Sequence, residues 1–205
     1  MQALFTQTLR FKAKDGSDFP DWEPVKLGSL LKERKTYLEK GKNLEHVSLT
    51  KKGVVPKSRR YDRDSLVNDA KTKTYKITRK GDLCYNPANL KFGVISINGY
   101  GDGIFSPIYV TFQVKTGYEN YLKHLIHDPD LRARMLRFQQ GTVYERMSVH
   151  PTDFISVNIN LPSLSEQQKI ADALSILDAK IAALTARLDA TREFKRGLLQ
   201  KMFVW

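Results

Sequence analysis

The glycine-rich stretch from Gly99 to Gly103 could serve chemistry, because the backbone amides of such stretches can cradle phosphates. Its spacing, GYGDG, matches neither a dinucleotide-binding loop nor a Walker loop. Both of those loops lead into a helix, whereas the residues after Gly103 are typical of a strand. The sequence therefore predicts a glycine-rich hairpin here rather than a nucleotide site.

Asn86-Pro87 begins like the Asn-Pro-Pro-aromatic tetrad with which adenine methyltransferases hold a target base. The next two residues are Ala88 and Asn89, which do not continue that pattern. No glycine-rich cofactor loop follows a predicted strand anywhere in the chain. Methyltransferase chemistry within this chain is therefore not expected.

Pro20-Asp21, followed by Glu33 and Lys35, fits the loose pattern of metal-dependent nucleases. In such a site two carboxylates hold a cation and a lysine lies beside the attacked phosphate. The second carboxylate and the lysine must lie on a strand, but the segment from Trp22 to Lys35 has the apolar spacing of a short amphipathic helix. A nuclease is an alternative, but not the favoured one.

His124 and His127 are three residues apart on a predicted helix and could ligate zinc. No cysteine or third histidine lies nearby at ligand spacing, so surface or partly buried histidines are the favoured interpretation. No serine stands in a nucleophile-elbow pattern. The sequence thus predicts no catalytic residue, no metal site and no cofactor bound by this chain.

The segment 51–80 carries a different signal, because DNA binding needs only that cations and donors share one face. It holds eleven Lys or Arg against three Asp, a local net charge of +8. A solvated basic loop is the alternative. We predict contacts with the phosphates or bases of double-stranded DNA from Lys51, Lys52, Lys57, Arg59, Arg60, Arg63, Lys71 and Lys73, and a second contact from Gln139, Gln140, Thr142 and Tyr144.

The charge of the whole chain supports a polyanionic partner. Its 205 residues include 34 Lys and Arg against 22 Asp and Glu, which gives a net charge of +12. Residues 165–205 are nearly balanced, with seven basic and five acidic side chains, so a protein partner is expected there. With no membrane-length apolar run, no signal peptide and one cysteine, we expect a bacterial or archaeal cytoplasmic protein without a membrane partner.

The elements that must position these residues are short in residues 1–162. An arm covers residues 1–22, and strands are expected over 44–49, 92–97, 108–114 and 155–161. A pair of helices is expected around Tyr121 to Ile126 and after Asp128-Pro129, where a cap and a first-turn proline mark the beginning of the second helix. These elements predict a globular domain of mixed strands and helices.

The residues from Ser165 to Phe203 predict one long helix, about 56 Å in length. Ser163 stands three residues before Glu166, and Ser165 stands three residues before Gln168; this is the spacing of a capping box. Apolar residues recur at alternating steps of four and three, interrupted at Thr191 and Lys195, which is a coiled-coil seam. The predicted dimer interface consists of Ile170, Leu174, Leu177, Ile181, Leu184, Leu188, Leu198 and Met202.

Together these patterns predict an α+β protein with a globular domain in residues 1–162 and a long dimerisation helix in residues 163–205. A helix of this length exceeds what a small domain needs to cover its own core, so it needs a partner. A long helix packed on its own domain remains the alternative.

The run LPSLSEQQKIA from Leu161 to Ala171, with the helix that follows, closely resembles the conserved region of type I restriction-modification specificity subunits. The opening LRFKAKDGSDFPDWEPVKLGSL, from Leu9 to Leu30, is similar to the beginning of a target recognition domain of that family. Residues 40–150 correspond to the variable part of such a domain, where the resemblance assigns no base contacts.

The resemblance implies a function for each part of the chain. In that family a subunit has two recognition domains and two conserved helices that pair antiparallel, and each domain reads half of a split DNA site. It implies binding to methyltransferase subunits, which carry S-adenosylmethionine, and through them to restriction subunits. This chain has one domain and one helix, so we expect a half-length form that dimerises and reads a palindromic split site. A stand-alone dimeric DNA-binding regulator is the other alternative.

Overall fold

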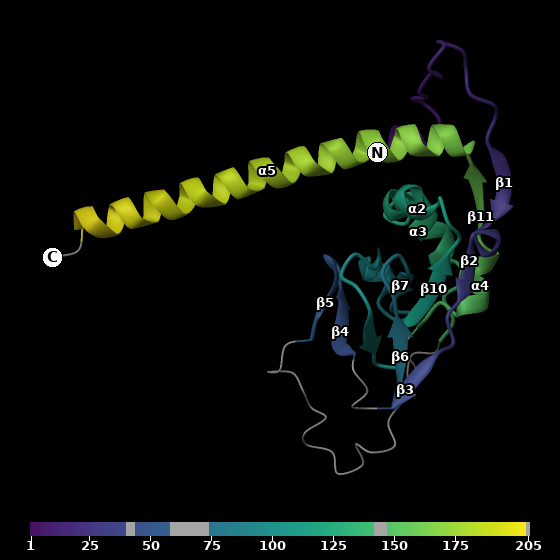
Figure 1. The fold of residues 1–205 in the computed structure, drawn as a ribbon, viewed down its shortest axis with the longest axis horizontal. Coiled ribbons are helices and arrows are strands. Elements are labelled where there is room, and N and C mark those ends of the chain that lie inside the picture. The colour runs from purple at the N-terminus through teal and green to yellow at the C-terminus, as the bar shows by residue number, and fades with distance from the viewer. Residues whose placement is uncertain (40–43, 58–73, 142–146, 204–205) are drawn as a thin grey trace.

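A computed structural model describes residues 1–39, 44–57, 74–141 and 147–203. In these residues, a domain of short strands and helices is followed by one long helix that projects far beyond it (Figure 1). The strands are mostly antiparallel and the helices are not interleaved with them as βαβ units, which confirms the predicted α+β class. No helix in this described part is both long and apolar enough to cross a membrane.

The first and last strands of the domain pair with each other. Strand β1 (Glu23–Lys26) runs antiparallel to β11 (Asn158–Leu161), with Val25 opposite Ile159. The prediction of a strand over 155–161 is therefore right only in its second half, because helix α4 (Pro151–Ser156) precedes β11. Pro151 lies in the first turn of α4 and favours the helix over an extended strand. The β1–β11 pair joins both ends of the domain just before the long helix.

Two larger sheets make up the rest of the domain. One has the order β2-β10-β7-β8 and is antiparallel; the other has the order β3-β6-β9-β4-β5, with a parallel pairing between β9 and β4. The strands are β2 (Leu31–Glu33), β3 (Tyr37–Glu39), β4 (Glu45–Thr50), β5 (Gly53–Pro56), β6 (Thr74–Thr78), β7 (Leu83–Tyr85), β8 (Ile95–Ile97), β9 (Gly103–Phe105) and β10 (Val110–Val114). The strands predicted around residues 44–49 and 108–114 are confirmed.

The helix predicted between Trp22 and Lys35 is wrong. Residues Leu27–Ser29 form a single 3-10 turn between β1 and β2. The apolar residues there are buried as their spacing requires, but the backbone of Glu33 pairs with that of Phe112 in β10. Non-local strand pairing, which local periodicity does not contain, decides the conformation.

The predicted pair of helices is confirmed as α2 (Glu119–Leu125) and α3 (Pro129–Leu136). Asp128 caps α3 by accepting a hydrogen bond from the backbone N–H of Leu131 at 3.0 Å. Helix α2 lies between the sheets and the long helix (Figure 1). In the main core, the rings of Tyr85, Phe112 and Phe154 stack with centroids 4.5 to 6.2 Å apart. A short helix α1 (Gln2–Phe5) adds Leu4 to the same core.

Helix α5 (Leu164–Phe203) is the long helix predicted from the heptad pattern. It begins where expected, because the hydroxyl of Ser163 accepts a hydrogen bond from the backbone N–H of Glu166 at 3.4 Å. Ile170, Ala171 and Leu174 are buried in the main core, so the first turns of α5 belong to the packing of the domain. Beyond them the helix extends away from the domain (Figure 1).

Candidate nucleic-acid interface

The predicted DNA contacts before residue 58 lie on one hairpin, but at opposite ends of it. Lys51 and Lys52 are exposed in the turn that joins β4 to β5. Lys57 follows β5 at the other end, where its backbone N–H donates to the carbonyl of His46 at 2.8 Å. The ladder between the two ends spans about 10 Å. The structure therefore does not gather all three lysines in one place.

Lys57 lines a hollow of about 150 Å³ on the surface of the five-stranded sheet. The hydroxyls of Ser48 and Tyr109 lie 3.4 Å apart in its wall, and Ile108 in the same lining is 61% exposed. Lysines contact phosphates, hydroxyls contact phosphates or base edges, and exposed apolar side chains contact thymine methyl groups. The Lys57 end of the hairpin therefore has the side-chain chemistry of a DNA contact.

Seven predicted contacts lie outside the described residues: Arg59, Arg60, Arg63, Lys71, Lys73, Thr142 and Tyr144. Another basic residue of the same span, Lys76, is only 3% exposed. Its Nζ lies 3.2 Å from the carboxylate of Glu33, so it serves the interior of the domain rather than its surface. The net charge that segment 51–80 presents to a polyanion is accordingly smaller than a count of its residues suggests.

Gln139 and Gln140 follow α3, and their amide groups bond within the domain. The side chain of Gln139 donates to the carbonyl of Met147 at 3.1 Å. The backbone of Gln140 pairs with that of Ser148 as an isolated antiparallel bridge, and its side-chain amide lies 3.5 Å from Asp153. These bonds hold together the two ends of the loop between them. The role of the loop as a second DNA contact stays a prediction.

A second cationic hollow, about 320 Å³, was not anticipated from the sequence. Arg34 and Asp82 form a bidentate ion pair in its lining, at 2.7 and 2.9 Å, and the hydrogen bond to Asp82 raises the pKa of Arg34. Arg79 and Lys80 line the same hollow and are exposed. Both belonged to the basic span 51–80, but nothing in their spacing separates them from the other lysines and arginines of that span.

The loop from Gly99 to Gly103 binds its own side-chain partner rather than leaving its amides free. The side-chain oxygen of Asn98 accepts from the backbone N–H groups of Tyr100 and Gly101, at 2.9 and 3.2 Å. The loop joins β8 to β9, which lie in different sheets, so the prediction of a hairpin is wrong although the turn is present. Because the amides of Tyr100 and Gly101 are already paired with Asn98, they are not available to cradle a phosphate.

Asn86 has a structural role in a turn. Its side-chain oxygen accepts from the backbone N–H groups of Ala88 and Asn89, at 3.1 and 3.2 Å, and the residue is buried. An asparagine that binds a target base needs this oxygen and the amide group turned toward a pocket. The geometry of Asn86 thus favours an Asx turn.

Glu33 lies on strand β2, contrary to the helix that was expected, and so meets one requirement of the nuclease pattern. Its carboxylate is nevertheless paired with Lys76 and Lys35, at 3.2 and 3.5 Å. Asp21 is fully exposed and lies 3.7 Å from Arg10. In residues 1–39, 44–57, 74–141 and 147–203, no three His, Cys, Asp or Glu side chains are grouped to hold a metal ion.

His124 joins α2 to α5. Its Nε2 lies 3.2 Å from the hydroxyl of Ser175, and its Nδ1 lies 3.6 Å from the carboxylate of Asp178. Burial lowers the pKa of His124, against the opposing effect of Asp178. The buried position of His124 agrees with a packing role between the two helices.

The predicted seam of α5 divides into two parts. Ile170 and Leu174 pack into the core of their own domain and are not available to a second chain. Exposure rises from 5% at Leu174 to 54% at Leu177, the next seam residue. The remaining seam residues are all exposed large apolar side chains: Leu177, Ile181, Leu184, Leu188, Leu198 and Met202. Such an exposed apolar stripe, interrupted at Thr191 and Lys195, indicates an interaction surface.

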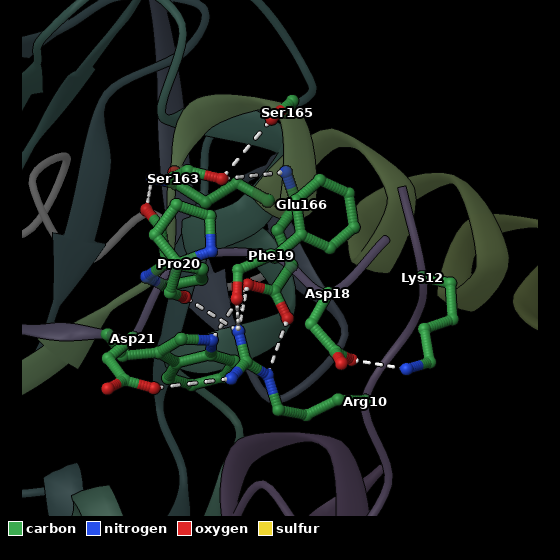
Figure 2. A network of polar contacts seen from close by, with 12 residues as sticks. Arg10, Lys12, Asp18, Phe19, Pro20, Asp21, Ser163, Ser165 and Glu166 are labelled. Atoms are coloured by element: carbon green, nitrogen blue, oxygen red, sulfur yellow. Dashed lines mark hydrogen bonds and ion pairs between the residues drawn. The ribbon is translucent and has the colours of Figure 1, made fainter. Parts of the chain in front are cut away.

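The base of α5 is anchored by a buried carboxylate that sequence reasoning missed (Figure 2). Glu166 is 0% exposed and receives hydrogen bonds from Arg10 Nε at 3.2 Å and Nη2 at 3.0 Å, and from the indole of Trp22 at 2.9 Å. The same Nη2 donates to the carbonyls of Phe19 and Pro20. The arm from Arg10 to Trp22 is thus fixed to the first turn of α5. The only sequence signal was the capping-box position of Glu166, which suggested a bond to the backbone instead.

Comparisons with known proteins identify the family of this domain and helix. A profile described as "Type I restriction modification DNA specificity domain" matches residues 20–191. The type I restriction enzyme MjaVIII specificity subunit of Methanocaldococcus jannaschii is 28% identical over 204 residues, which cover 97% of this chain and 46% of that protein. The chain therefore spans about half the length of this curated relative.

Solved structures show the same fold. The HsdS subunit from Thermoanaerobacter tengcongensis is 18% identical with a TM-score of 0.50, covering 82% of this chain and 40% of that one. The type I restriction-modification S subunit from M. genitalium is 15% identical with a TM-score of 0.57, covering 95% and 49%. Because the family profile matches more than four-fifths of the sequence, this chain belongs to the family of type I restriction-modification DNA specificity domains.

Proposed function

We propose that this chain selects the DNA sequence on which a type I restriction-modification complex acts. The family match over residues 20–191 carries the proposal. The partly exposed Lys57 and the hollow that it lines at this end of the β4–β5 hairpin support it, because they offer phosphate and base-edge contacts. In this proposal the chain has no catalytic activity, binds no cofactor and contributes only recognition.

The exposed seam of α5 supports a second step, in which two copies of the chain pair through antiparallel helices. Such a dimer has a twofold axis, so two identical domains lie at opposite ends of the coil and read inverted half-sites. The site would be a palindrome split by a spacer, and the length of the coil would set that spacer. The apolar stripe from Leu177 to Met202 is the surface that this pairing would bury.

The partners follow from the family. We propose that the dimer binds type I methyltransferase subunits, which bring S-adenosylmethionine and methylate adenine, and through them the type I restriction subunits. One similar structure, with a TM-score of 0.56 and 18% identity, is described as showing complex assembly and conformational transition of the type I R-M system. A bacterial or archaeal cytoplasm is the compartment in which such a complex would meet DNA.

Adenine methylation across the genome of the source cell, with and without this gene, tests the proposal. Loss of methylation at one palindromic split motif is the expected result. An unchanged pattern would contradict sequence selection by this chain. Loss at an asymmetric motif would keep recognition but exclude pairing of two identical copies. Co-purification with a methyltransferase subunit separates the proposal from a stand-alone regulator, which the family match does not favour.

Light scattering on the purified chain tests the dimer directly. Leu188→Asp places a charge in the seam and should give a monomer. Ala186→Asp places the same charge elsewhere on the same exposed stretch of helix, off the seam, and should leave the dimer intact. Equal behaviour of the two variants would show that the seam is not the interface.

A further inference from the structure

The burial pattern along α5 limits how far a second helix can extend along it. Ile170 and Leu174 continue the seam toward the domain, but their side chains are enclosed in the core of their own chain. A partner helix can therefore follow the seam only as far as Leu177, the first exposed seam residue. The inference drawn from this limit rests on the dimer proposed above. It goes beyond that proposal because it selects one register of the two helices.

In an antiparallel pair of helices, residue numbers along the interface increase in one chain and decrease in the other. Successive core layers must therefore keep heptad positions a and d opposite each other, which allows registers that differ by whole heptads. One of these registers places Leu177 opposite the partner's Met202 and Ile181 opposite the partner's Leu198. It then places Leu184 opposite the partner's Lys195 and Leu188 opposite the partner's Thr191. We propose that the dimer adopts this register, with its twofold axis between residues 189 and 190.

This register pairs every exposed seam residue of the described helix. Its two polar seam residues, Thr191 and Lys195, each face a leucine. The long stem of Lys195 can cover the partner's Leu184 while its ammonium group reaches solvent. Outside the core layers, Arg187 comes beside the ring of the partner's Phe194, which is 73% exposed in the isolated chain. A guanidinium over an aromatic face is a favourable contact.

The two neighbouring registers are worse for reasons visible in the structure. A shift of one heptad toward the domain places Leu198 opposite the partner's Leu174, which is already buried in its own core. A shift of one heptad in the other direction leaves Leu177 without a partner in the described helix and places Thr191 opposite the partner's Lys195. That pairing puts two polar residues in the same core layer, whereas the selected register places a leucine opposite each of them.

The selected register fixes the distance between the two domains. The points at which the two helices leave their domains, near Ser175, would lie about 44 Å apart along the coil. DNA advances about 3.4 Å per base pair, so this separation corresponds to about 13 base pairs. A heptad shift would change it by about 10 Å, or about three base pairs, and would place the second half-site out of reach of the second domain.

Disulfide trapping tests the register in the full chain. The double variant Leu177→Cys with Met202→Cys should form a covalent dimer on air oxidation, because facing cysteines come within the roughly 7 Å between Cα atoms that a disulfide requires. Ile181→Cys with Leu198→Cys reports the same register at a second place. The native Cys84 is fully buried, which raises its pKa to about 12, so it should not compete.

Two control pairs report the shifted registers. Leu177→Cys with Lys195→Cys should be trapped only after a shift toward the domain, and Leu184→Cys with Met202→Cys only after a shift in the other direction. Trapping of either control in preference to the first two pairs would overturn the register while leaving the dimer in place. A monomer by light scattering before oxidation would overturn both the register and the proposed dimer. Circular dichroism of each variant confirms that its helix is intact.

Discussion

At the scale of single residues, Glu166 shows how a charge can be tolerated inside the domain. The carboxylate is removed from solvent, but Arg10 and Trp22 supply three N–H donors to its two oxygens. A buried charge that is paired and hydrogen-bonded is stable, whereas removal of one partner leaves the other uncompensated. The position of α5 on the domain therefore depends on a contact between residues far apart in the sequence.

Glu166→Gln should reduce the free energy of unfolding by about 3 kcal/mol, because it keeps the side-chain shape but removes the buried counter-charge of Arg10 and leaves only the exposed Asp21 beside it. Urea denaturation of the full chain measures this. Glu193→Gln, on an exposed part of the same helix, should change the same quantity by less than about 0.5 kcal/mol. A loss below about 1 kcal/mol at Glu166 would mean that the ion pair does not hold the helix in place.

His124 should make stability depend on pH. Burial lowers its pKa in the folded state, with Lys123 and His127 adding to that effect and Asp178 opposing it. The unfolded state then binds more protons, so the free energy of unfolding is highest above the ordinary histidine pKa of about 6.5 and falls as the pH decreases below it.

His124→Gln should flatten this dependence between about pH 7 and pH 5 in denaturation experiments. His127 also has a lowered pKa, through desolvation, and should leave a residual slope that His127→Gln removes. A variant that lacks His124 yet keeps the full slope would show that other groups, not this contact between α2 and α5, titrate in the range.

At the scale of elements, α5 and the pair α2 and α3 were predictable because their signals are local. A cap, a first-turn proline and a 3.5-residue apolar period all lie within the segment that they describe. Strand β2 was not predictable in this way. Its apolar residues fit a helix equally well, and only the backbone of β10, about eighty residues later, makes it a strand.

In the candidate site, too, local features could be predicted from the sequence, whereas features set by tertiary contacts could not. The sequence identified a basic stretch, but it could not show that Lys76 points inward to Glu33 or that Lys51 and Lys57 lie at opposite ends of a hairpin. Ion-pair partners and hairpin register are set by tertiary contacts. The apolar seam lies on α5 as its spacing indicated, but its first two residues pack into the domain, and its role as a dimer interface stays a prediction.

The two ends of the β4–β5 hairpin should differ in their contribution to DNA binding. Lys57 lines the hollow with Ser48 and Tyr109, and it leads into the most basic part of the sequence. Lys57→Ala should therefore lower the dependence of log affinity on log salt by about one unit, the loss of one phosphate contact. Lys51→Ala, at the turn, should lower it by less. Fluorescence anisotropy over a range of salt concentrations measures the salt dependence of DNA affinity for each variant. A larger decrease for Lys51→Ala than for Lys57→Ala would place the DNA at the turn.

At the scale of the whole molecule, positive charge is concentrated on the domain and is nearly balanced on the helix. Residues 1–164 hold 27 basic against 17 acidic side chains, and residues 165–205 hold seven against five. A polyanion is therefore attracted to the domain more strongly than to the helix.

Arg59→Ala combined with Arg60→Ala should weaken DNA binding far more than Lys180→Ala. The two arginines belong to the densest run of positive charge, whereas Lys180 lies on the exposed helix next to the seam. Titration of each variant with duplex DNA at one salt concentration gives the two dissociation constants to be compared. An equal loss from both would mean that the helix, and not segment 51–80, contributes the electrostatic attraction.

The anchor at Glu166 also has a mechanical consequence. From Ser175 to Phe203 the helix extends about 42 Å from its support, so it acts as a lever whose pivot lies where it leaves the domain, and the contact between Arg10, Trp22 and Glu166 holds the part of the helix before that point. A tilt of about 5° at the pivot would move the far end by nearly 4 Å, which is about one base-pair step of DNA. In the proposed dimer, a few hydrogen bonds at one end of the helix would thus help to determine which base pairs the partner's domain contacts at the other end.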